Sequence, residues 1–317
     1  MKCSEINIHQ KKDFYSTPHI FTITLLTLLI LILLPETCLE GARRGLILWF
    51  NTLLPTLFPF FLVTRLIIEL DLCPKVLRPY YPVFVGLLAG YPAGALTCSE
   101  MSKRGLLSRS KAQCLLIACN NASPAFLINY VNCCCLDLTG HRFIIWMSVI
   151  SSSFIIAIFY YMLFCNTDNA EYTPTASPVS STPDDVPLSS VVEAVMMHSF
   201  EILVMIGGYV IIFSILAAIL MVFPVSGLCA AVLSGILEVT TGCGLIAGLT
   251  PDIPLYIKSA AAAALCGFGG LSAILQTNSA IRASKLSIKK YILHKSICGI
   301  LSGIICVIIL SVIHHHP

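Results

Sequence analysis

Gly90-Tyr91-Pro92-Ala93-Gly94 interrupts one apolar stretch of the chain, and Asn120-Asn121-Ala122-Ser123-Pro124 interrupts the next. A second pair of breaks follows at Glu238-Val239-Thr240-Thr241-Gly242 and Gly267-Phe268-Gly269-Gly270. The members of a pair start 120 − 90 = 30 positions apart in the first half and 267 − 238 = 29 apart in the second. Gly- and Pro-interrupted apolar segments at matching places in two halves are typical of transporters whose binding site lies at mid-membrane.

The composition sets the class of protein. Of the 317 residues, 57% are hydrophobic and 11% are charged, with a mean hydropathy of +0.88. A soluble domain carries about 25% charged residues, so the composition favours a membrane protein over a soluble enzyme. The formal net charge of +3 is small and scattered, and the long basic stripe of a nucleic-acid binder is absent from the sequence.

Five apolar runs are near or above the length that crosses about 30 Å of hydrocarbon as a helix. They lack the ten-residue alternation of a membrane barrel, and backbone polar groups must be satisfied inside lipid, so we expect helices. Lys11 and Lys12 precede the first run, but no A-x-A-like cleavage site follows it, which favours an uncleaved span. The runs are Ile20–Leu34, Thr52–Leu70, Phe143–Phe164, Ile202–Phe223 and Ser296–Ile313.

Basic residues predict the orientation, because loops rich in Lys and Arg stay in the cytoplasm. If Val83–Thr97 and Pro224–Leu249 each dip into the membrane and return to the side they entered, two basic loops lie inside. The two hairpins then enter from opposite sides, which is inverted-repeat symmetry. The first loop carries Lys103, Arg104, Arg109 and Lys111, and the second carries Arg282, Lys285, Lys289, Lys290 and Lys295.

We therefore predict an all-α polytopic membrane protein with two inverted repeats, re-entrant hairpins and broken transmembrane helices. Its expected segments are an N-terminal anchor span with its flank (1–45), a first repeat (46–165), a linker (166–190) and a second repeat with a C-terminal span (191–317). The linker is rich in Pro, Ser and Thr and has too little apolar content to pack.

Five motifs follow one another between about Leu46 and Arg282. They are Trp49-Phe50-Asn51 with Leu54-Pro55-Thr56-Leu57-Phe58-Pro59-Phe60, Gly90-Tyr91-Pro92-Ala93-Gly94-Ala95, Asn120-Asn121-Ala122-Ser123-Pro124, Glu238-Val239-Thr240 and Gly267-Phe268-Gly269-Gly270. In this order they resemble the SpoVV/YlbJ sporulation integral membrane proteins. These proteins carry the nucleoside-recognition Gate domain and are distantly similar to concentrative nucleoside transporters.

The resemblance implies a protein of endospore-forming bacteria, made in the mother cell and placed in the outer forespore membrane. It also implies a link to the movement of dipicolinate toward the developing spore. The 166–190 insert and the Cys133–Cys135 run match no pattern of this family.

The breaks supply candidate substrate-binding residues. Broken helices free backbone N–H and C=O groups, and a half-helix N-terminus attracts anions. The alternative is that small and polar residues here only let helices pack closely. The candidates are Gly90, Tyr91, Pro92, Gly94, Asn120, Asn121, Ser123, Glu238, Thr240, Thr241, Gly267, Gly269, Gln276 and Asn278.

Two charges fall within apolar surroundings. Glu238 would repel a dianionic ligand, so we expect that it is protonated, that a cation lies between them, or that the ligand lies nearer the first-half break. The cation would be a coupled Na⁺ or H⁺, or a Ca²⁺ carried with the ligand; no other cofactor is expected. Arg65 has Glu69 four residues on, which predicts a helix-face ion pair; the alternative is that Arg65 binds the ligand.

The fifteen cysteines predict no metal site, because most lie in apolar segments and no C-x-x-C pair exists. The exception in spacing is Cys133-Cys134-Cys135, with Asp137 and His141, which we place in a short outside loop. Walker A, G-x-S-x-G and H-E-x-x-H motifs are also absent from the sequence, so no enzyme is predicted.

The resulting hypothesis is a secondary transporter or facilitator for a small anionic metabolite, with dipicolinate the family-based choice. The alternatives are a nucleoside-type transporter and a non-transporting membrane partner that recruits other sporulation proteins. Other sporulation membrane proteins and further copies of this chain are the candidate protein partners.

Overall fold

The computed structural model describes residues 18–164 apart from 71, 73 and 75, then residues 187–225 and 227–315. Helices and their connections account for all of these described residues, with no strand among them, so the prediction of an all-α protein is confirmed. The elements of the first half are α1 (Pro18–Leu33), α2 (Pro35–Leu48), the π-helix η2 (Trp49–Leu53), α3 (Leu54–Glu69), η3 (Arg78–Tyr80), α4 (Tyr81–Ala89), α5 (Ala93–Lys103), α6 (Arg109–Cys119), the π-helix η4 (Ala125–Cys135), η5 (Thr139–His141) and α7 (Ile144–Phe164).

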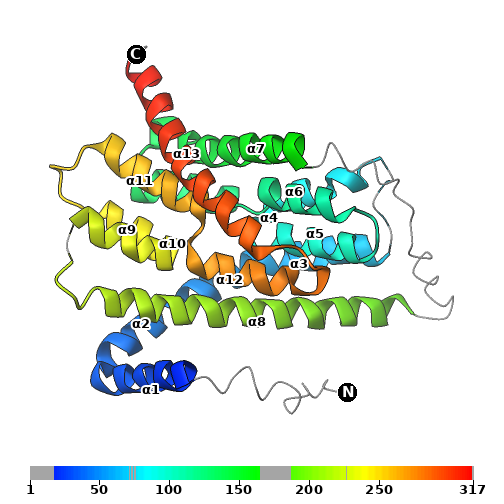
Figure 1. The fold of residues 1–317 in the computed structure, drawn as a ribbon, viewed down its shortest axis with the longest axis horizontal. Coiled ribbons are helices and arrows are strands. Elements are labelled where there is room, and N and C mark those ends of the chain that lie inside the picture. Colours follow the sequence, from blue (N-terminus) through cyan, green and yellow to red (C-terminus); the bar gives the residue numbers. More distant parts are fainter. Residues whose placement is uncertain are drawn as a thin grey trace.

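The second half repeats the order of the first. Its elements are α8 (Leu188–Leu220), α9 (Gly227–Leu237), α10 (Val239–Ala247), α11 (Leu255–Phe268), α12 (Gly270–Ile281), η6 (Arg282–Ser284) and α13 (Ile288–His315). In each half a helix precedes a hairpin (α4–α5 or α9–α10), then a broken helix (α6–η4 or α11–α12), then a long helix. Figure 1 shows α4, α5 and α6 toward one end of the molecule and α9, α10 and α11 toward the other, so the hairpins enter from opposite ends.

Four helical segments among the described residues are long and apolar enough to cross a membrane: Thr139–Phe164, Leu188–Leu220, Leu255–Ser284 and Ile288–Ile313. Three of them contain most or all of a predicted run. Large apolar side chains such as Phe159, Val204 and Ile304 are exposed on these helices, as expected where helices contact the lipid bilayer. The chain is therefore a polytopic membrane protein.

Two of the predicted spans differ in the structure. The first run lies in the 16-residue α1, which is long enough to cross a membrane only together with α2, and the two helices are bent by 101° at the break between Leu33 and Pro35. Pro35 has no N–H to continue the helix, and its ring clashes with the preceding turn, so α2 starts there in a new direction. The Thr52–Leu70 run forms the end of η2 and the 16-residue α3.

Two of the expected segment boundaries fall within continuous helices. Helix α2 runs across the 45/46 boundary, and α8 begins at Leu188, inside the expected linker. Residues 166–186 of that linker lie outside the described residues. The 33 residues of α8 extend for about 50 Å, longer than one crossing needs.

Close glycine contacts hold both hairpins. A Cβ added to Gly86 of α4 would lie 1.9 Å from the carbonyl oxygen of Cys119, and one added to Gly94 of α5 would lie 2.6 Å from the same oxygen. In the second hairpin, a Cβ on Gly242 would lie 2.2 Å from the Cα atom of Gly235. The first hairpin therefore packs against the end of α6, and the two arms of the second pack against each other, at separations that only small residues permit.

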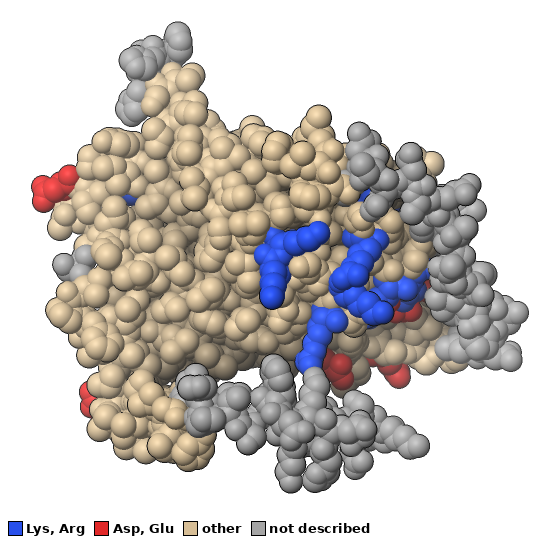
Figure 2. Space-filling view, viewed as in Figure 1, with Lys and Arg blue, Asp and Glu red and all other residues tan. Residues whose placement is uncertain are grey.

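The two basic loops lie on one side of the molecule. Arg109 at the start of α6 donates a hydrogen bond to the carbonyl of Lys285, after η6. Gln113 and Ser287 exchange two further hydrogen bonds, of 2.7 and 3.2 Å. Figure 2 shows the Lys and Arg side chains gathered on one part of the surface. The positive-inside rule predicts that this end faces the cytoplasm.

Gly86→Ala tests the packing of the first hairpin. We expect a lower melting temperature, equivalent to about 1–3 kcal/mol, because the methyl group overlaps backbone that cannot move aside. Gly208→Ala in α8 is the control, since a Cβ there meets nothing within 4 Å. Thermal unfolding of both purified variants measures the effect, and equal stability of the two would contradict the close approach.

Candidate functional site

All four breaks meet at one cavity of about 780 Å³, here called the central cavity. Its volume lies within the range of about 300–1,000 Å³ found for small-molecule sites. Both π-helices contribute to its wall, and such irregular helices occur frequently at functional sites. The lining residues with polar side chains are Tyr91, Ser123, Asn129, Tyr130, Cys134, Glu238, Thr240, Ser272 and Gln276, and the rest of the wall is mostly apolar.

The two first-half breaks contact each other through backbone. The N–H of Tyr91 donates to the carbonyl of Asn121 at 2.6 Å. Gly90 has a φ of +77°, and a Cβ there would lie 2.6 Å from the nitrogen of Ser123. Glycine is therefore required at position 90 by both conformation and space.

The two second-half breaks also contact each other. A Cβ on Gly270, whose φ is +80°, would lie 3.2 Å from the carbonyl oxygen of Gly235 and 3.3 Å from the nitrogen of Val239. The second-half breaks thus pack together like those of the first half, and each half brings one pair of broken segments to the central cavity.

Glu238 caps helix α10. Its carboxylate accepts hydrogen bonds from the N–H of Thr240 at 3.0 Å, the N–H of Thr241 at 2.7 Å and the hydroxyl of Thr241 at 2.9 Å. A carboxylate in this position satisfies free N–H groups and complements the helix dipole. The N-terminus of α10 is thus already occupied by the protein's own anion, although Glu238 still lines the cavity.

Asn120 is fully buried and joins the two halves. Its Oδ1 accepts from the N–H of Ala95 at 3.3 Å, and its Nδ2 donates to Thr277 and Tyr291 at 2.8 Å each. These partners belong to α5, α12 and α13. Asn120 therefore holds the first-half break against the second repeat, rather than facing the cavity.

Asn121 accepts a hydrogen bond from a buried lysine. Its Oδ1 accepts from the hydroxyl of Ser153 at 2.6 Å and from the ammonium of Lys295 at 2.9 Å. Lys295 is 1% exposed in α13, so the prediction that it marks a cytoplasmic loop is wrong. The prediction rested on a run of basic residues ahead of an apolar segment. Helix α13 starts seven residues before Lys295, so Lys295 lies within the helix and not in the loop.

The candidate substrate-binding residues fall into groups according to whether they line the central cavity. Six of them line the central cavity: Tyr91, Ser123, Glu238, Thr240, Gly269 and Gln276. Others pack around it without lining it: Gly90, Gly94, Asn120, Asn121, Thr241 and Gly267. Pro92 lines a neighbouring cavity, and Asn278 is exposed and lines neither one. A substrate-binding role for the cavity residues stays a prediction.

Sequence reasoning missed several wall residues. The rings of Phe126 and Tyr130 stack at 5.3 Å with an interplanar angle of 25°, and Asn129 lies between them in the chain. Tyr130 also donates from its hydroxyl to the carbonyl of Thr240 at 3.3 Å, which joins the halves across the cavity. These residues directly follow the Asn120–Pro124 break, and this position in the sequence could have identified them as candidate wall residues.

A second cavity of about 160 Å³ lies at the basic end, and we call it the vestibule. Gln276 and Ile206 line both the vestibule and the central cavity, so these two side chains lie between the two. The vestibule is otherwise lined by residues of α3, α5, α8 and α12 and by one residue of η6: Arg65, Leu96, Ser99, Glu100, Lys103, His198, Ile202, Met205, Tyr209, Ser279, Ala280 and Ala283, together with Pro92.

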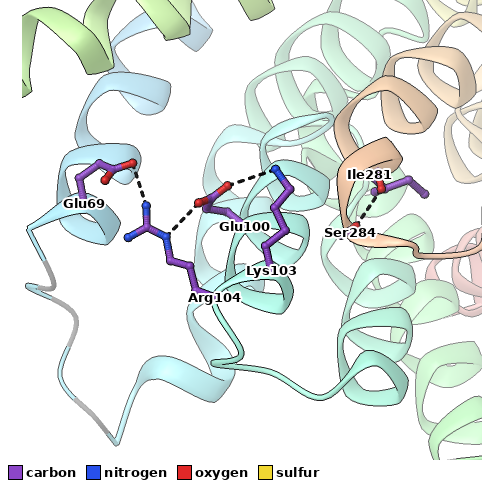
Figure 3. Close-up of polar contacts among 6 residues, drawn as sticks. All are labelled: Glu69, Glu100, Lys103, Arg104, Ile281 and Ser284. Atoms are coloured by element: carbon purple, nitrogen blue, oxygen red, sulfur yellow. Dashed lines mark hydrogen bonds and ion pairs between the residues drawn. The ribbon is translucent and has the colours of Figure 1, made fainter. Parts of the chain in front are cut away.

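The expected ion pair between Arg65 and Glu69 is not formed. Glu69 instead binds Arg104 at 2.8 Å, and Arg104 also binds Glu100 at 2.9 Å (Figure 3). Burial alone lowers the pKa of Arg104, but the hydrogen bonds to Glu100 and Glu69 outweigh this and raise it above its ordinary value. Tertiary pairing with α5 has therefore replaced the local pair within α3.

Cys133, Cys134 and Cys135 lie in η4, so their expected placement in a loop is wrong. Among the described residues, no group of three or more His, Cys, Asp or Glu side chains is placed to hold a metal ion. Two buried thiol pairs occur at equivalent places in the repeats, with sulfur separations of 3.5 Å for Cys98–Cys119 and 3.8 Å for Cys243–Cys266.

Spanning helices, paired breaks and a shared cavity define an integral membrane protein with a mostly apolar interior cavity that carries several polar side chains. The chain is 20% identical over 315 residues to "Sporulation integral membrane protein YlbJ" of Bacillus subtilis (strain 168), covering 85% of this chain and 77% of that protein. This similarity confirms the resemblance to the SpoVV/YlbJ proteins. No family model matches the chain, and no solved structure matches it.

Lys295→Met tests whether the buried ammonium stabilises the fold. We expect equal or higher stability, by an amount on the order of 1 kcal/mol, because a methionine of similar volume avoids the desolvation of a charge. Lys289→Met, at an exposed position of α13, is the control and should change nothing. A large fall in melting temperature for Lys295→Met alone would show that the ammonium has a structural role.

Proposed function

We propose that this protein is a secondary transporter or facilitator for a small anionic metabolite. The observation that carries the proposal is the meeting of four helix breaks, two from each repeat, at the central cavity. Polar backbone and side chains inside a membrane are costly, and a purely structural helix bundle gains nothing from such a cavity. A relative with a membrane role in sporulation supports placing the protein in that process.

Dipicolinate is the substrate that we propose. The cavity offers the ring of Tyr91 and the stacked rings of Phe126 and Tyr130 as apolar faces for a flat aromatic ligand. Gln276 and Ser123 add hydrogen-bond donors. We propose export from the mother cell across the outer forespore membrane, with other sporulation membrane proteins or further copies of this chain as candidate partners.

Glu238 requires that a dianion does not enter alone. A coupled Na⁺ or H⁺, or a Ca²⁺ carried by the dianion, would offset the repulsion at the cavity wall. Carboxylate oxygens suit each of these cations, and Glu238 would be the residue that faces the cation. The Thr240 and Thr241 donors hold that carboxylate in place.

Flux through the purified protein tests the proposal. Liposomes that contain the protein should accumulate radiolabelled dipicolinate faster than protein-free liposomes, and faster than they accumulate uridine. Faster uridine flux would support a nucleoside-type transporter instead. Absence of flux for both compounds, with a normal melting temperature, would favour a non-transporting membrane partner.

Glu238→Gln tests the charge at the cavity wall. We expect the variant to fold, because the amide oxygen still accepts from α10, and we expect the dependence of dipicolinate uptake on pH or cation to change. Uptake is measured across a pH series with and without Na⁺ and Ca²⁺. Glu193→Gln, at an exposed position of α8, is the control. Identical profiles for Glu238→Gln and wild type would remove Glu238 from the mechanism.

A further inference from the structure

Arg65 is a half-buried cation that faces the vestibule. It lies in α3 and lines both the vestibule and a small adjoining hollow between α3 and α5. Its natural partner on the same helix, Glu69, is bound to Arg104. Among the described residues, no hydrogen bond or ion pair from the Arg65 guanidinium is found. A guanidinium removed from water without such a partner is unfavourable unless an anion joins it.

The surrounding charges leave an excess of one positive charge. On α3 and α5, three cations (Arg65, Lys103 and Arg104) stand against two carboxylates (Glu69 and Glu100), so 3 − 2 = +1 for these two helices. Both carboxylates attract Arg65, but their hydrogen bonds go to Arg104, and Lys103 lies 3.6 Å from Glu100. His198 on α8 faces Glu201 at 3.3 Å. Arg65 is therefore the cation that remains available.

A second feature points to a ligand in the same cavity. Ser99 is 2% exposed and lines the vestibule, and its hydroxyl oxygen has no hydrogen-bond partner within the described structure. A buried hydroxyl without a partner costs about 1–3 kcal/mol, so its place in the wall suits a ligand oxygen. Tyr209 and Ser279 bond to each other at 2.8 Å on another part of that wall.

The vestibule adjoins the central cavity. Pro92, at the first-half break, and Gln276, on α12, both belong to its wall. Gln276 also lines the central cavity, where its amide bonds to Ser272 at 3.1 Å. Gln276 therefore lies between the vestibule, which Arg65 also lines, and the central cavity. The N-terminus of α5 has no side-chain cap of its own, unlike α10 with Glu238.

We propose that the vestibule is an anion-binding site in which Arg65 and Ser99 hold a carboxylate group of a small dicarboxylate at the cytoplasmic end. The proposal deepens the proposed function, on which it rests for the choice of ligand. Arg65 supplies a planar pair of donors that matches a carboxylate, and Ser99 supplies one further hydroxyl. Glu238 does not line the vestibule, and the one carboxylate that does, Glu100, is paired with Arg104 at 2.9 Å and with Lys103 at 3.6 Å.

Equilibrium binding to detergent-purified protein tests the site without requiring transport. The probe is radiolabelled pyridine-2,6-dicarboxylate, with the uncharged 2,6-dicarboxamide as competitor. We expect Arg65→Gln to weaken binding by about tenfold to a hundredfold, Arg65→Lys to weaken it less, and Ser99→Ala to weaken it by several-fold. The dicarboxamide should not compete.

Two controls separate this effect from general surface charge. Arg142→Gln removes an exposed arginine at the start of α7, and Lys111→Gln removes an exposed cation at the basic end; neither should change binding. The melting temperature of Arg65→Gln should not fall, since no ion pair is lost. A fall in melting temperature with unchanged affinity in the folded fraction would assign Arg65 a structural role and overturn the proposal.

The failures of the two proposals are distinguishable. Dicarboxylate flux in liposomes, together with binding that is insensitive to Arg65→Gln and Ser99→Ala, would overturn the vestibule site and leave the transporter in place. Arg65-dependent binding without any flux would support the site and contradict transport. Equal binding of the dicarboxylate and the dicarboxamide would show that no anion site exists.

Discussion

The structure depends on one constraint, the need to satisfy backbone polar groups where helices break inside a membrane. The protein meets it by placing breaks against breaks. The N–H of Tyr91 donates to the carbonyl of Asn121, and the capping carboxylate of Glu238 takes the first N–H groups of α10. The contact between the first-half breaks requires very close approach, which explains glycine at position 90, where a Cβ would overlap the backbone of Ser123. The central cavity is the space left where these four segments meet.

Charge is distributed unequally between the breaks of the two repeats. The second-half break carries an acidic residue, Glu238, whereas basic residues lie near the first-half breaks: Lys295 of α13 donates a hydrogen bond to Asn121, and Arg65 of α3 lines the vestibule together with Pro92. The surroundings of the first-half breaks are therefore the more favourable ones for an anion. Inverted repeats with equal folds can in this way present unlike chemistry to the two ends of one ligand.

Local pairing rules failed where tertiary contacts competed with them. Arg65 and Glu69 have the spacing of a helix-face pair, yet such a pair contributes only a few tenths of a kcal/mol. Arg104 reaches Glu69 from α5 while it also binds Glu100, and the shared network is worth more than the local pair. In the same way, Lys295 follows four other basic residues in the sequence, but its helix begins before it and carries it into the interior.

The sequence by itself determined the helical membrane class, the repeated order of elements and the places where helices break. These follow from apolar run length and from Gly and Pro, whose effects on the backbone are local. Only the tertiary structure decided which break residues face a cavity: Gln276 does and Asn278 does not, two positions apart on α12. It also decided which charges pair. Helix rotation determines which residues face the cavity, and long-range contacts determine which charges pair. Neither can be predicted from the spacing of residues in the sequence.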